Sequence, residues 1–174
     1  MSASAPSATS QTQQSLPGKA TGVLLGIGLG GFVDGIVLHQ ILQWHHMVSH
    51  VDGLTPDTVR GLQVNTFADG LFHLLAWACV IAGSTLGVAA WQRGERAPSW
   101  RYHFGLVLAG WGIFNLVEGF VNHHLLGIHH VRDDLGAPLT WDLGFLAVSA
   151  ALALGGLFLH RSGIALNSRP ARVG

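Results

Sequence analysis

The chain has 174 residues, of which 49% are hydrophobic and only 10% are charged. This charged fraction is less than half of that in an ordinary soluble domain, so composition indicates lipid as the solvent for most of the chain. A formal net charge of zero gives no reason to expect a nucleic-acid partner, and a single cysteine excludes a disulfide framework or a thiolate metal cluster within one chain.

The first twenty residues are polar and rich in Ser, Gln, Thr and Ala. They lack the basic segment of a cleaved signal peptide, so we expect a disordered tail over 1–20. Four apolar stretches follow, each long enough to cross a hydrocarbon core, which takes about 20 helical residues. We expect an all-α polytopic membrane protein, a bundle of four transmembrane helices at about 21–46, 65–91, 102–128 and 139–161. These form a membrane domain over 21–162, and a second tail covers 163–174.

The basic residues are distributed unevenly between the two sides of this arrangement. Arg60 and Arg132 fall in the connections after the first and third helices. The others lie beside the termini and the middle connection: Lys19, Arg93, Arg96, Arg101, Arg161, Arg169 and Arg172. By the positive-inside rule, both termini are cytoplasmic and the first and third connections face outward.

The first and third helices share a sequence pattern. Residues 34–46 and 118–130 both read acid-G-x-V-x-H-x-x-L-x-x-H-H. The second and fourth helices match more weakly, since Asp69 and Asp142 each lie just inside the outer end. The pattern predicts two repeated helical hairpins, related by a pseudo-two-fold axis along the membrane normal.

Each predicted helix carries one acidic residue at a depth that the bilayer disfavours. An acid near the bilayer centre costs about 2.5 to 3.5 kcal/mol, and no lysine or arginine is available at that depth to neutralise it. At a rise of about 1.5 Å per residue, three histidines lie at similar depths in the outer half. The sequence therefore predicts a metal site there, with ligands from Asp34, Asp69, Glu118, Asp142, His39, His73 and His123.

The spacing of these residues gives mixed signals. Asp69 and His73 are four apart and project from one helix face, as a chelating pair would. Asp34 and His39 are five apart, as are Glu118 and His123, which separates such side chains by about 140° on a straight helix. Either one member of each pair faces a different neighbour, or the helix contains a π-bulge.

Imidazole and carboxylate without thiolate suit Fe, Zn or Mn, and Cu as copper(II). Redox activity is then one role for the bound metal ion. The signature Glu-x-x-His of soluble metal bundles is absent. Secondary candidate ligands lie at the outer interface, where an interfacial role is the alternative: His45, His46, His124, His129 and His130.

Two other functions remain open at the level of sequence. An ion or proton transporter could use the same acids and histidines, but polar residues would then continue into the inner half, and they do not. A haem could be held between His39 and His123 as axial ligands. The sequence leaves open whether the protein is an enzyme, whether it forms a homo-oligomer in the lipid bilayer, and which protein donates electrons or metal to it.

Residues 31–46, together with Asp69-Gly70-Leu71-Phe72-His73 and Asn122-His123-His124, resemble a bacterial family of predicted multi-pass membrane proteins known as domain of unknown function 2243. The resemblance covers nearly all of the chain beyond the polar tail. It implies a bacterial inner (cell) membrane location and carries no established activity.

Overall fold

The computed structural model describes residues 18–167, and every regular element there is helical. The elements are α1 (Lys19–Val33), η1 (Asp34–Ile41), α2 (Val59–Gln92), α3 (Trp100–Glu118), η2 (Gly119–Leu125), η3 (Asp133–Leu135) and α4 (Leu139–Asn167). The segments η1 and η2 are π-helices that continue α1 and α3, whereas η3 is a short 3-10 helix. The all-α class is therefore confirmed.

Four helical runs of the described chain are long and apolar enough to cross a membrane. They are Lys19–Ile41, Val59–Gln92, Trp100–Leu125 and Leu139–Ala165. The predicted number of membrane-spanning helices is thus confirmed by length and composition.

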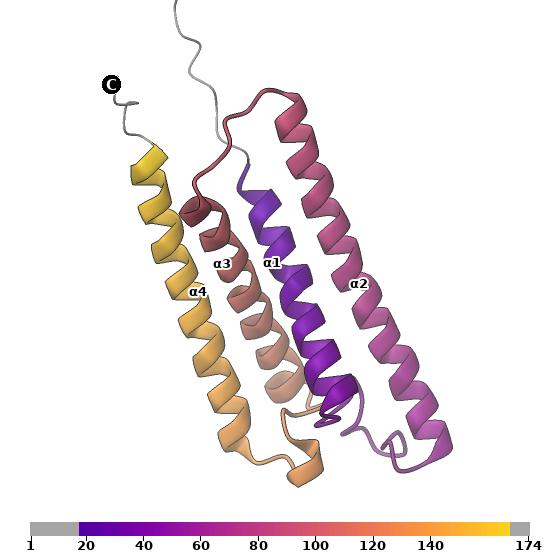
Figure 1. The fold of residues 1–174 in the computed structure, drawn as a ribbon. Helices are drawn as coiled ribbons and strands as arrows, with labels where there is room; N and C mark the ends of the chain where they lie inside the picture. The colour runs from indigo at the N-terminus through magenta and orange to yellow at the C-terminus, as the bar shows by residue number, and fades with distance from the viewer. Residues whose placement is uncertain (1–17, 168–174) are drawn as a thin grey trace, which may run out of the picture.

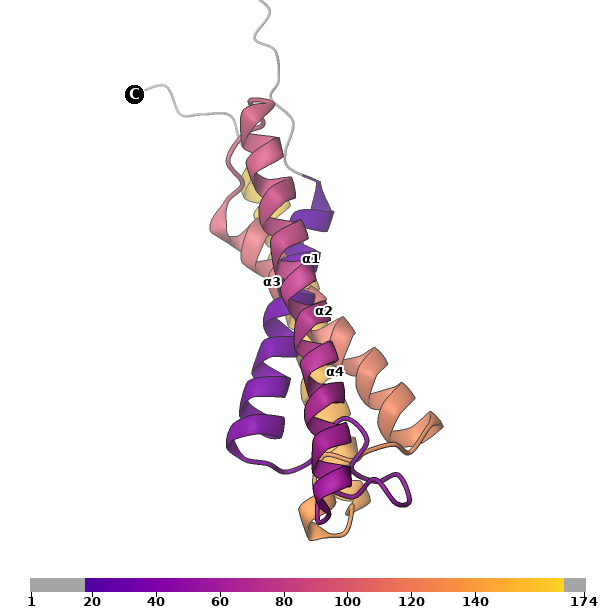
Figure 2. The same cartoon turned by 90° about the vertical axis from the view of Figure 1, so that its right-hand side faces the viewer.

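The four helices stand side by side in the order α2, α1, α3, α4, as Figure 1 shows. The helix α1 contacts α2 and α3, and α4 contacts α3. Figure 2 views the same row edge-on, with α1 and α3 crossing each other at its centre. Both hairpin connections, 42–58 and 126–138, lie at one end, which we call the hairpin end, and the terminal end lies opposite.

Glycines allow the central helices to approach closely. A Cβ atom at Gly26 of α1 would lie 2.1 Å from the Val107 carbonyl oxygen of α3, and one at Gly110 would lie 2.4 Å from the Val23 carbonyl oxygen. Small residues at such crossings let backbones meet in a bilayer, where lipid offers helices no hydrophobic reason to associate. Below the crossing the two helical runs diverge, so η1 and η2 lie on opposite sides of the hairpin end (Figure 2).

The helix ends differ from those expected. The first helical run stops at Ile41 and not near residue 46, and the third stops at Leu125 and not near residue 128. Both runs stop because the chain enters the left-handed region, at Gln43 with a φ of 51° and at Gly127 with a φ of 57°. The paired histidines that follow therefore lie in non-helical backbone.

The second helix begins at Val59, before the expected residue 65, because the Thr58 hydroxyl caps it by accepting a 3.0 Å hydrogen bond from the Gly61 amide. The helix α1 starts inside the expected tail 1–20, and α4 extends through part of the expected tail 163–174. The rest of the two tails, 1–17 and 168–174, lies outside the described residues.

Candidate metal centre

The π-helices bring each acid to the same side of the chain as the histidine five residues later. The Leu42 amide donates to the Val37 carbonyl over 2.8 Å, and the Leu126 amide does the same to Val121. This wider turn places His39 Nε2 3.6 Å from Asp34 Oδ2. The π-helical reading of the five-residue spacing is confirmed, and such distortions often mark functional sites.

Two groups of three potential ligands form at the hairpin end. Site 1 consists of Asp34, His39 and His45, and site 2 consists of Glu118, His123 and His129. Within each site, one ligand atom from each residue lies within 4.8 Å of the other two, and all six residues are buried. Each site therefore offers two imidazoles and one carboxylate at a spacing that one ion can bridge.

In site 1, the far nitrogen of each imidazole ring is already held. His39 Nδ1 lies 2.9 Å from Asp69 Oδ1, and His45 Nδ1 donates to the Val131 carbonyl over 3.0 Å. The Nε2 atoms of both rings are buried without a hydrogen-bond partner. A proton on Nδ1 leaves the Nε2 lone pair free, which is the form of histidine that binds metal ions.

Site 2 repeats this geometry. His129 Nδ1 donates to the Met47 carbonyl over 3.0 Å, and His129 Nε2 lies 2.9 Å from Glu118 Oε1. His123 Nδ1 lies 3.3 Å from Asp142 Oδ1, and His123 Nε2 lies 3.9 Å from Glu118 Oε1 without a hydrogen bond. The sites differ in two respects: Glu118 and His129 already bond to each other, and His123 Nδ1 lacks the hydrogen bond that His39 Nδ1 makes with Asp69.

The two remaining intramembrane acids lie behind the histidines and outside both groups of three. Asp69 Oδ2 bonds to His46 Nδ1 at 2.6 Å, and Asp69 Oδ1 also accepts from the Met47 amide at 2.9 Å. Asp142 does the same with His130 Nδ1 at 2.6 Å and the Val131 amide at 2.9 Å. Asp69 and Asp142 thus lie where they can orient the histidine rings, a role that carboxylates often have around metal sites.

The other residues named from the sequence lie elsewhere. His73 belongs to neither group, and its ring stacks on Phe32 at 6.2 Å, where Gly35 leaves room for it. His124 is exposed on η2. His45 and His129, which the sequence ranked as secondary candidates, complete the two sites. The signal that distinguishes them is the repeated His-His pair: its first residue belongs to a group of three, and its second residue binds an acid.

The pKa values of the two loop histidines shift in opposite directions. Burial, reinforced by the imidazoles of His129 and His39, lowers the pKa of His45 well below its usual value, so this ring is neutral. For His129, burial lowers the pKa, but the hydrogen bond and charge of Glu118 outweigh it and the net pKa is raised. A metal ion in site 2 would therefore take the place of a proton between Glu118 and His129.

The two sites meet at the hairpin end, between the two connections. The rings of His45 and His129 stack with their centroids 4.8 Å apart and their planes 3° from parallel. The His39 ring lies 6.0 Å from the His129 ring, and the His123 ring lies 6.2 Å from the His45 ring. The four imidazoles form one continuous cluster.

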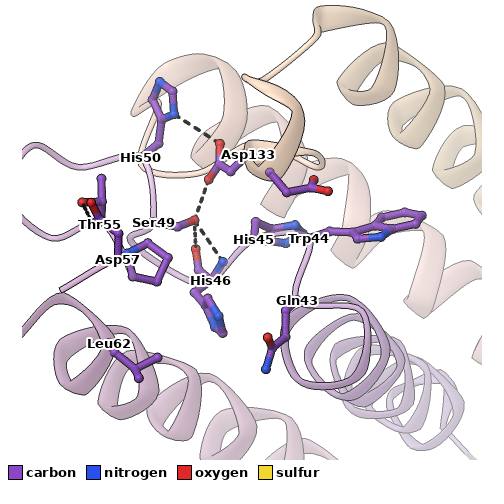
Figure 3. A pocket seen from close by; sticks show the side chains of 12 residues that line it. Gln43, Trp44, His45, His46, Ser49, His50, Thr55, Asp57, Leu62 and Asp133 are labelled. Atoms are coloured by element: carbon purple, nitrogen blue, oxygen red, sulfur yellow. Dashed lines mark hydrogen bonds and ion pairs between the residues drawn. The ribbon is translucent and has the colours of Figure 1, made fainter. Parts of the chain in front are cut away.

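A pocket of about 610 Å³ opens at the hairpin end, beside site 1 (Figure 3). The Ser49 hydroxyl bridges its rim by donating to Asp133 Oδ2 at 2.5 Å, while it accepts from the His46 amide at 3.0 Å. The side chain of Gln43 also lines the pocket. Because His45 and His46 belong to this lining, the pocket gives site 1 an approach from the hairpin end.

The fold and the buried cluster define a class of protein: a membrane protein of four apolar helices that carries its histidines and carboxylates at one end. Residues 21–163 match the family described as Predicted membrane protein (DUF2243), and the chain belongs to that family. The description of the family gives a membrane location and no activity. No curated protein and no solved structure matches the chain.

Proposed function

We propose that this protein binds two metal ions inside the membrane, one in site 1 and one in site 2. The observation that carries the proposal is the state of the histidine rings. In site 1, the ring nitrogens that face away from the site are fixed by Asp69 and by a backbone carbonyl, while the buried Nε2 atoms that face it have no hydrogen-bond partner. A buried polar atom without a partner is costly, and a metal ion at each site would satisfy these atoms.

The ligand set limits the metal. Two imidazoles and one carboxylate, with positions left open, occur in catalytic zinc sites and in non-haem iron(II) oxygenases. Manganese and copper(II) accept the same atoms, whereas copper(I) prefers sulfur ligands. Iron, manganese or copper would make the centre redox-active, and the open position would admit a small ligand.

Charge favours a divalent ion. Site 1 contains the Asp34 carboxylate and has that of Asp69 behind His39, and site 2 contains the Glu118 carboxylate and has that of Asp142 behind His123. In the described part of the chain, the ion pairs of these four acids are all with histidine. One divalent cation per site would neutralise two carboxylates, which the low dielectric of a membrane interior favours.

Matching contacts in the two halves support the proposed repeat of a helical hairpin. The pair His45 with Val131 corresponds to the pair His129 with Met47, and both nitrogen–oxygen distances are 3.0 Å. The Asp69 contacts with a ring nitrogen and a backbone amide correspond to those of Asp142. A duplicated hairpin would hold two equivalent ions about a pseudo-two-fold axis.

The positive-inside rule supports an orientation with the hairpin end outside and both termini in the cytoplasm. For a bacterial protein this places the centre at the outer side of the inner membrane, where ions or an external partner can reach the pocket beside site 1. The metal centre is therefore proposed to exchange ions, or a small ligand, with the exterior.

The geometry favours single ions over haem. Axial ligation would require His39 and His123 to face each other across a porphyrin, but their Nε2 atoms face the carboxylates of their own sites, at 3.6 and 3.9 Å. It also favours binding over transport. Toward the terminal end, the described buried polar residues beyond the sites are few: Asn115, Ser149 and His160.

The test is elemental analysis of the purified protein, before and after reconstitution with Zn²⁺, Fe²⁺, Mn²⁺ or Cu²⁺. We expect two ions per chain, one ion after the double substitution His39→Ala with His45→Ala, and one after His123→Ala with His129→Ala. The exposed His124 provides the control, since His124→Ala should retain two ions. Absence of stoichiometric metal under all four conditions would refute the proposal.

A further inference from the structure

Each site relies on the other half of the molecule to orient one of its histidines. We infer that the two sites are coupled, so that an ion bound in one raises the affinity of the other. This inference rests on the proposed function and adds to it that the two ions load together. It follows from two paths of hydrogen bonds and close polar contacts between the sites.

The first path leads from site 1 to site 2. An ion that binds His39 fixes its ring against Asp69 Oδ1, at 2.9 Å. The same oxygen accepts from the Met47 amide at 2.9 Å, which sets the orientation of the loop there. The Met47 carbonyl accepts from His129 Nδ1 at 3.0 Å. Ordering site 1 thereby places a ligand of site 2.

The second path runs in the reverse direction through equivalent residues. The His123 ring faces Asp142 at 3.3 Å, and Asp142 accepts from the Val131 amide at 2.9 Å. The Val131 carbonyl then accepts from His45 Nδ1 at 3.0 Å. Ordering site 2 thereby places a ligand of site 1, so the coupling has a structural route in both directions, as thermodynamic linkage requires.

Direct contacts between the two loops make them move as one unit. The His50 amide donates to the Ile128 carbonyl over 3.0 Å, and the Asp134 amide donates to the Trp44 carbonyl over 3.2 Å. Between these contacts, the rings of His45 and His129 stack face to face at 4.8 Å. Neither loop can shift to an empty-site arrangement without disturbing the ligand histidine of the other.

Repulsion between two cations acts against this coupling. It is weakened here because each divalent ion would sit beside two carboxylates, so that each filled site is neutral. The ordering term remains, because the first ion fixes a loop that the second ion then need not fix. The sign of the coupling is therefore positive, and typical coupling between sites changes affinity by about 5- to 150-fold.

The experiment is a Zn²⁺ titration of the metal-free protein in detergent, followed by native mass spectrometry that counts chains with no, one or two ions. Glu118→Gln and His123→Ala each remove site 2, and Asp34→Gln and His39→Ala each remove site 1. Two different variants per site guard against loss of folding by one of them. His124→Ala, on the exposed face of η2, is the matched control.

We expect the second Zn²⁺ ion to bind the wild-type protein about 5- to 150-fold more tightly than one ion binds the remaining site of any variant. Chains with one ion should make up less than about half of the population at half saturation, below the level of two equal and independent sites. Two ions that bind with the affinities of the isolated sites would overturn the coupling and leave the proposed function intact. If neither Zn²⁺ nor another divalent ion binds, both the coupling and the proposed function are overturned.

Discussion

Replacement of Asp69 by Asn preserves the size of the side chain and removes its charge. The carboxylate accepts from His39 and Met47 on one oxygen, and from His46 at 2.6 Å and Gln40 at 3.1 Å on the other. In asparagine, one of these two oxygens remains as an acceptor. The other is replaced by an NH₂ group, which cannot accept from the donors on its side. Loss of the hydrogen bond to His46 alone should reduce the free energy of unfolding by about 1.5 to 3 kcal/mol, the usual value for a bond to a charged group.

Metal affinity should fall as well, because Asp69 orients the His39 ring and polarises it. Removal of such an orienting carboxylate typically lowers affinity by about 10- to 100-fold. Competition with a chromogenic chelator would measure the change at site 1, and Asp142→Asn should produce the same loss at site 2. Asp52→Asn, in the exposed part of the first connection, is the control. If Asp69→Asn binds two ions with unchanged affinity, the orienting role is wrong.

Three further predictions follow from the geometry. A chelator should lower the melting temperature measured by circular dichroism. A divalent ion at about 100 times its dissociation constant should then restore about 2.7 kcal/mol of unfolding free energy per site, and equal melting curves with and without metal would contradict this. Gly26→Ala should destabilise the α1–α3 crossing by about 1 to 3 kcal/mol, because its Cβ would lie 2.1 Å from the Val107 carbonyl oxygen. Gly70→Ala is the control: nothing lies within 4 Å of its Cβ, so stability should be unchanged or higher. Gln43→Gly should raise the free energy of unfolding by about 1 kcal/mol and Gly127→Ala should lower it by a similar amount, since both residues have a positive φ; opposite signs in a denaturation assay would refute the strain.

The sequence was sufficient for the four spans, and it named four of the six residues that form the two groups: Asp34, His39, Glu118 and His123. Apolar length determines the spans, and the π-helices η1 and η2 bring each acid to the same side as the histidine five residues later. The five-residue spacing also contained the information for a π-helix, because an acid and a histidine at that distance can share a site only if the turn widens.

The sequence was not sufficient for the ends of the helices. The apolar residues Ile41, Leu42 and Trp44 continue the pattern of the first helix, so the pattern alone extends it to residue 46. The left-handed turn occurs at Gln43, and glutamine is not a residue type that predicts such a turn. In the other half it occurs at Gly127, and glycine does predict it. Without the turn, His45 cannot be placed beside His39.

The position of His73 shows a second limit of sequence reasoning. Its spacing from Asp69 favoured a chelating pair, but spacing on one helix says nothing of what other elements bring to the same carboxylate. In the structure, His39 and His46 from the first helix and its loop bind Asp69, while His73 packs on Phe32. Partners distant in sequence decided which neighbour Asp69 binds.

The helices form a row, and this has a consequence for how the protein holds together in lipid. Only 11% of the apolar 18-residue stretch of α2 is buried inside the molecule, against 50% of the corresponding stretch of α3, so α2 is surrounded mainly by lipid tails. Lipid tails compete equally well for an apolar helix face, so this contact does little to fix the height or rotation of α2. Polar bonds at the hairpin end help to do so: Asp69 bonds to His39 and His46, and Asn65 accepts from the Val48 amide over 3.0 Å. The helix α4 is held differently, because glycines let its backbone pack closely on α3. Loss of these polar bonds should therefore loosen α2 more readily than α4, and would expose α2 to membrane proteases.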